Sequence, residues 1–95
     1  MNRIEQSKEA LDALRKRVDN IDNALVFLLA ERFCVTQDIG KMKKKQNWSA
    51  VDNLREQEQF VRIKRLAEDA GLSPEFAERF LRLIIEEVVL NHNRL

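Results

Sequence analysis

The sequence has 95 residues, which suits a single domain, and a net charge of +1 with 35% charged residues. It therefore lacks the strong charge bias that favours nucleic acid or an anionic membrane as a partner, and we expect neither. Only two Gly and one Pro occur, which predicts an all-α domain over residues 1–95. A single cysteine, Cys34, and a polar Met1–Ala10 stretch predict a cytoplasmic protein with no internal disulfide, signal peptide or membrane span.

The first predicted helix runs from about residue 8 to Lys45, after a weakly patterned start. Its apolar residues recur every three or four positions, as on one face of an amphipathic helix. One heptad position within this pattern holds a cation, Arg32. We call the apolar residues the seam: Leu11, Leu14, Val18, Ile21, Leu25, Leu28, Val35, Ile39 and Met42.

The length of this helix indicates a second chain. At about 1.5 Å per residue it spans roughly 55–60 Å, whereas a compact domain of this size is only about 26 Å across. The rest of the chain cannot cover such a helix, so we expect a bend or, as we favour, a homodimer. Gly40 inside the helix is either a point of close approach or a weak point.

Two further helices are predicted, from about Asn53 to Ala70 and from Pro74 to about Asn93. Ser49 or Asp52 can cap the first of them, and Gly71 suits its C-terminal end. Ser73, followed by a proline, is typical of an N-cap. The expected inner residues are Leu54, Phe60, Val61, Ile63, Leu66, Ala67 and Ala70 in one helix, and Phe76, Phe80, Leu81, Ile84, Ile85 and Val88 in the other.

Several polar residues fall on these inner faces. Arg32 and Lys43 lie within about 20° of one another around the first helix, where they repel unless an anion lies between them. Alternatively, both side chains extend along their stems into solvent. Asp52 and Glu56 share a face of the second helix, although Asp52 can be a plain cap.

The remaining candidates have simpler explanations. His92 continues the apolar stripe of the third helix, where a lone histidine is more often structural. We expect Cys34 to be at least half-buried and Trp48 to cover the core. The sequence has no metal-ligand spacing, phosphate loop or hydrolase triad, so we expect no metal and no cofactor. Inner-face cations near two carboxylates suit a small dianionic ligand inside a helical bundle.

Five short motifs, in this order and spacing, resemble the helix signatures of the all-helical (AroQ-type) chorismate mutases. The resemblance covers about Leu11 to Leu95. The motifs are Leu14–Asp22 (LRKRVDNID), Leu28–Arg32 (LLAER), Ile39–Lys43 (IGKMK), Asp52–Glu56 (DNLRE) and Leu83–Glu87 (LIIEE).

The resemblance implies an intertwined homodimer with two active sites. Its reaction is the Claisen rearrangement of chorismate to prephenate, in the shikimate pathway to phenylalanine and tyrosine, without a cofactor. Arg15 and Arg32 would hold the two substrate carboxylates, and Lys43 would reach a carboxylate and the ether oxygen of the breaking bond. Asp52 and Glu56 would bind around the ring hydroxyl, braced by Arg55.

Two positions depart from the family pattern. His92 stands where Gln or Glu usually donates to the ether oxygen, and Val88 replaces a small polar residue one turn earlier. Val88 can line the pocket but cannot donate, whereas His92 can donate as imidazole or imidazolium. If imidazolium is the better donor, activity should fall as pH rises through histidine titration, and a His92→Gln variant should flatten the profile.

The positions of two arginines give an independent argument for the dimer. Arg15 and Arg32 lie about 25 Å apart along one helix and about 100° apart around it. They cannot grip one small molecule from the same straight helix. If both serve one site, Arg15 must come from the partner chain.

Two other functions compete with the mutase. An isochorismate pyruvate-lyase of salicylate formation resembles the mutases in its cationic residues, although the Asp52 and Glu56 pair fits the mutases better. A non-catalytic helical dimer, acting as a regulatory or partner-binding module, predicts no turnover at all.

Overall fold

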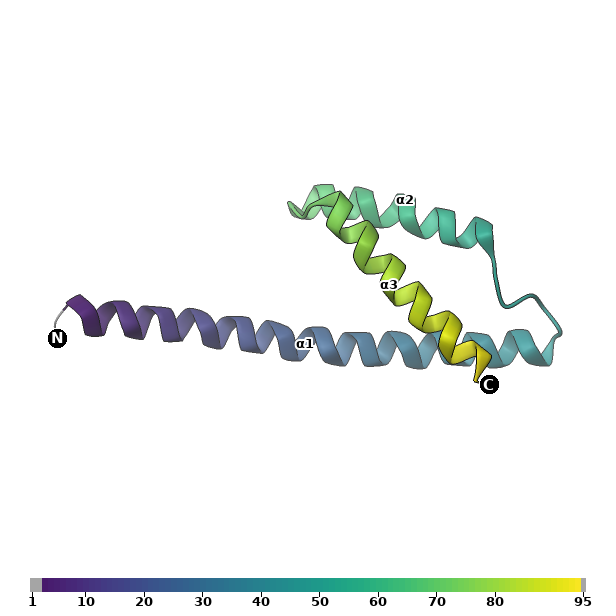
Figure 1. The fold of residues 1–95 in the computed structure, drawn as a ribbon, viewed down its shortest axis with the longest axis horizontal. Helices are drawn as coiled ribbons and strands as arrows, with labels where there is room; N and C mark the ends of the chain where they lie inside the picture. The colour runs from purple at the N-terminus through teal and green to yellow at the C-terminus, as the bar shows by residue number, and fades with distance from the viewer. Residues whose placement is uncertain (1–2, 95) are drawn as a thin grey trace. The chain divides into compact units, whose positions relative to one another are not determined.

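A computed structural model describes residues 3–94, with side chains from Ser7 onward. Within this range the chain forms three α-helices and no strand: α1 (Arg3–Lys45), α2 (Asn53–Ala70) and α3 (Pro74–Asn93) (Figure 1). The three predicted helices of an all-α fold are therefore confirmed. The chain divides into two compact units, Met1–Cys34 and Val35–Leu95, which are described separately below.

Helix α1 begins earlier than its side-chain pattern predicts. It starts at Arg3 rather than near residue 8, because residues 3–7 include good helix formers that extend an established helix at one bond per residue. Its end at Lys45 is confirmed. Asn47 has φ 61°, and the Trp48 N–H donates to the Lys43 carbonyl at 2.8 Å, so a left-handed residue closes the helix.

The first unit has no core within the described residues. None of residues 7–34 is buried, and only three of them are even half-buried. The seam itself is open: Leu14, Ile21 and Leu28 are 54%, 58% and 67% exposed. From Ser7 to Cys34, no residue covers the apolar face that the sequence predicts to be buried.

Helices α2 and α3 form a hairpin with well-defined ends. Oδ1 of Asp52 accepts from the Arg55 N–H at 3.1 Å, so Asp52 is the N-cap of α2. Ser49 instead closes a short turn, because its hydroxyl donates to the Val51 carbonyl at 3.0 Å. Gly71 ends α2 with φ 75°, and Ser73 caps α3 by accepting from the Phe76 N–H at 3.2 Å.

The core of the second unit lies between these two helices. The four buried apolar residues are Ala67 on α2 and Ala77, Leu81 and Ile84 on α3. Small alanines let the two backbones approach closely. At the rim, Lys64 pairs with Glu78 at 3.2 Å, which joins α2 to α3 beside the core.

The prediction of inner residues was too broad. The apolar residues of α2 lie around more of its circumference than α3 covers. On α3, the rings of Phe76 and Phe80 remain exposed to solvent. The expected inner residues that are exposed in the chain are Leu54, Val61, Leu66, Ala70, Phe76 and Phe80.

Candidate functional site

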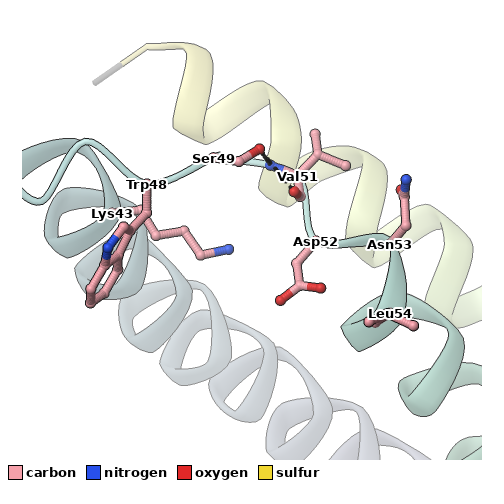
Figure 2. A pocket seen from close by; sticks show the side chains of 7 residues that line it. All are labelled: Lys43, Trp48, Ser49, Val51, Asp52, Asn53 and Leu54. Atoms are coloured by element: carbon pink, nitrogen blue, oxygen red, sulfur yellow. Dashed lines mark hydrogen bonds between the residues drawn. The ribbon is translucent and has the colours of Figure 1, made fainter.

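The end of α1, the connection after it and the start of α2 enclose an open hollow of about 470 Å³. Figure 2 shows the Lys43 ammonium group and the Asp52 carboxylate directed into the same space from opposite sides. The hollow thus presents one cation and one anion to a ligand. Its lining residues are Lys43, Trp48, Ser49, Val51, Asp52, Asn53 and Leu54.

Lys43 is held near the hollow by its position in the last turn of α1. Its side chain is half-buried, and Nζ donates to the Ala50 carbonyl at 3.5 Å. An ammonium group carries three hydrogens, so two stay available for an anionic ligand.

Asp52 combines a structural role with its place in the hollow. One carboxylate oxygen caps α2, which agrees with the prediction that Asp52 can be an N-cap. The side chain also faces Lys43 across the hollow (Figure 2). Glu56, one turn further along α2, is half-buried. Arg55 does not line the hollow: its guanidinium is exposed and pairs with Glu58 at 3.6 Å.

Val88 and His92 lie one turn apart on α3, and both are half-buried. The His92 Nε2 lies 3.0 Å from the backbone carbonyl oxygen of Thr36 on α1. This contact links the C-terminal end of α3 to the part of α1 that follows Cys34. His92 is therefore part of the packing of this unit, and neither residue lines the hollow of Figure 2.

The two predicted carboxylate-binding arginines belong to the first unit. Arg32 is half-buried, and its Nη1 has no solvent-exposed surface, so its guanidinium does not simply extend into water from the seam. Arg15 is different: its side chain is 70% exposed and lies 4.0 Å from Asp12. Arg15 is thus on the surface of the single chain.

Two expectations about other residues were wrong. Trp48 is 61% exposed and lines the hollow instead of covering the core, because the turn after α1 directs it away from the α2–α3 hairpin. Cys34 is exposed, since the first unit provides nothing to bury it. Sequence reasoning missed Trp48 and Ser49 as lining residues, and the only signal was their place between Lys43 and Asp52.

No group of three or more His, Cys, Asp or Glu side chains in the described residues could hold a metal ion. Among the same residues, no helix combines the length and apolarity needed to cross a bilayer.

The sequence matches the family described as chorismate mutase type II over residues 14–93. The chain therefore belongs to the chorismate mutase type II family, which confirms the family predicted from the five motifs.

Relatives differ greatly in length. The chain is 34% identical over 89 residues to a bifunctional chorismate mutase/prephenate dehydratase of Buchnera aphidicola subsp. Schizaphis graminum, covering 94% of this chain and 23% of that protein. It is 30% identical over 83 residues to the T-protein of Enterobacter agglomerans, covering 87% and 22% respectively. It is 28% identical over 78 residues to a chorismate mutase of Methanocaldococcus jannaschii, covering 82% of this chain and 79% of that protein. The chain thus spans less than a quarter of the first two relatives.

Proposed function

We propose that this chain is a chorismate mutase domain, which rearranges chorismate to prephenate. The observation that carries the proposal is the family match over residues 14–93, together with relatives named chorismate mutase. The hollow between Lys43 and Asp52 supports it, because the ring hydroxyl and the anionic groups of chorismate need both an acceptor and a cation.

The chemistry requires positioning and electrostatics and no covalent partner. In the substrate, the bond between a ring carbon and the ether oxygen breaks while a new carbon–carbon bond forms, and the electrons move within one ring of six atoms. The flexible dianion must be held in the compact shape that brings the two carbon ends together. Negative charge grows on the ether oxygen, so fixed donors aimed at it stabilise the transition state more than the substrate.

Each predicted residue has a role in this proposal. Arg32 and the partner's Arg15 bind the two carboxylates, and the Lys43 ammonium group reaches one of them and the ether oxygen. Asp52 and Glu56 accept from the ring hydroxyl, with Arg55 supporting the start of α2. From their match to the family motif, Val88 is proposed to supply an apolar wall and His92 to be the second donor to the ether oxygen.

A homodimer completes the proposal. A 43-residue α1 is about 65 Å long, and all nine seam residues are exposed in the single chain. A continuous apolar stripe of this kind is typical of a surface that another chain covers. Pairing two copies along α1 buries the seam and brings Arg15 of one chain toward the Arg32 site of the other.

The test is to incubate the protein separately with chorismate and with isochorismate and to identify the products. We expect prephenate from chorismate, whereas pyruvate and salicylate from isochorismate alone would favour the lyase, and no turnover would favour a non-catalytic dimer. Arg32→Ala should lower turnover at least about 10²–10³-fold with the dimer still folded, whereas Arg17→Ala, at an exposed position of α1, should not. An Arg32→Ala variant within twofold of wild type would contradict the site assignment.

A further inference from the structure

Gly40 and His92 are joined through one backbone group. The His92 Nε2 approaches the Thr36 carbonyl oxygen at 3.0 Å, and Gly40 follows Thr36 by four residues and is buried. In an α-helix the Cβ of a residue points toward the N-terminus and covers the turn before it. A side chain at position 40 would therefore cover the Thr36 carbonyl, and glycine leaves that oxygen open to the histidine ring.

The partner atom determines which ring nitrogen carries the proton. A carbonyl oxygen only accepts hydrogen bonds, so Nε2 of His92 must be the donor. In the neutral ring the proton is then on Nε2, and Nδ1 holds a lone pair. Nδ1 becomes a donor only when the ring is protonated to imidazolium.

We infer that Gly40 and the Thr36 carbonyl are positioning groups that restrict His92 to acting on the substrate through Nδ1, so that only the imidazolium form assists the rearrangement. This inference rests on the proposed mutase function. The ether oxygen gains negative charge in the transition state and needs a donor. A neutral His92 would present a lone pair to that oxygen and repel it, whereas imidazolium would donate from Nδ1 while Nε2 stays bound to Thr36.

The charges on α3 and α1 also bear on the protonation of His92. On α3, Glu86 and Glu87 are exposed and lie on other faces of the helix than His92, at about 100° per residue. Along α1, the charged residues nearest Thr36 on its stripe are cations: Arg32 comes one turn before it, and Lys43 follows about two turns after it.

Near the start of α2, two carboxylates stand beside one cation, Arg55, and the substrate is a dianion. Asp52 and Glu56 are the carboxylates at the start of α2, and Asp52 faces the hollow. Cations oppose a protonated ring, whereas carboxylates and a dianionic substrate favour it. The pH effect should appear in kcat/KM.

The first experiment compares the pH dependence of kcat/KM for the wild type, His92→Gln and the control Glu86→Gln. Wild type and Glu86→Gln should lose activity about tenfold per pH unit above the histidine titration, while His92→Gln should be flat because an amide donates at every pH. Identical profiles in wild type and His92→Gln would overturn the inference alone. Absence of chorismate turnover in the wild type would overturn both the inference and the proposed function.

The second experiment tests Gly40 with a readout other than activity. Because His92 is the only histidine of the chain, its ring protons can be assigned directly by NMR. We expect a slowly exchanging Nε2–H resonance in the wild type and its loss in Gly40→Ala, with kcat lowered at least tenfold and KM little changed. Alanine has the higher helix propensity, so a folded Gly40→Ala protein is expected. A retained Nε2–H resonance and unchanged kcat in this variant would exclude the positioning role.

Discussion

The two units of the chain differ in whether they bury their apolar residues. Val35–Leu95 has a core of its own, in which Leu81 and Ile84 of α3 are buried beside Ala67 of α2. In Met1–Cys34, no residue from 7 onward is buried, although the seam is just as apolar. The second unit can therefore gain stability within one chain, whereas the first gains hydrophobic stability only by covering its seam with something else.

The residues of the proposed site are also divided between the two units. The second unit positions Lys43 and Asp52 around one hollow without help. The first unit carries Arg15 and Arg32, whose spacing prevents both from reaching one ligand on the same straight helix. Assembly of the proposed dimer should thus control the carboxylate-binding part of the proposed site more than the hollow.

The largest effect is expected from a charge in the seam. Ile21→Asp should separate the dimer and abolish turnover, because an unpaired buried carboxylate costs several kcal/mol. Analytical ultracentrifugation should show dimers for the wild type and monomers for the variant. The control is Asn20→Asp, which places the same carboxylate one position off the seam; equal behaviour of the two variants would argue against the seam as the interface.

A truncation in the hairpin core should act on stability. Leu81→Ala removes a side chain that is only 5% exposed and should lower the free energy of unfolding by about 2–5 kcal/mol. Leu83→Ala, at a position that is 65% exposed, should change it by less than about 1 kcal/mol. Urea unfolding of the two variants makes the comparison, and similar midpoints would show that this core does not stabilise the unit.

The smallest effect is expected at the start of α3. Ser73→Ala should cost about 1 kcal/mol of stability, because the Phe76 N–H loses its acceptor, while Ser73→Thr keeps the cap. A backbone hydrogen bond at the helix start, followed by the Ser73 hydroxyl, lowers the pKa of Glu75.

The lowered pKa of Glu75 gives this prediction a pH dependence. A group with a lowered pKa in the folded state stabilises the protein at neutral pH, and this contribution is lost as pH falls through its pKa. The stability difference between wild type and Ser73→Ala should therefore shrink in acid. Thermal melts at neutral and acidic pH measure it, and a difference that grows in acid would contradict this account of Glu75.

Local chemistry made the helix ends predictable. Gly71 and the Ser73–Pro74 pair specify the α2–α3 turn through backbone conformation and capping, so both boundaries agree with the structure. The sequence did not decide between Ser49 and Asp52 as a cap, because both side chains can accept from a free N–H. The start of α1 was misplaced because residues 3–7 extend the helix through backbone propensity rather than side-chain pattern.

The candidate site was only partly predictable. Lys43 and Asp52 could be found from their helix positions and family motifs, and the structure places both around the hollow. The partner of His92 is a backbone carbonyl, which every residue has, so no side-chain pattern points to Thr36. The exposure of Trp48 depends on the path of one turn, which the identity of the residue does not specify.

The most direct test of the central proposal measures the activity of a mixture of two inactive variants. Arg15→Ala and Arg32→Ala homodimers should each be nearly inactive, and equal amounts are unfolded, mixed and refolded together. If each site takes Arg15 from one chain and Arg32 from the other, every mixed dimer has one intact site, and the mixture should recover about one quarter of wild-type activity. If both arginines act within one chain, every site in the mixed dimer lacks one of them, and the absence of recovered activity would contradict the shared site.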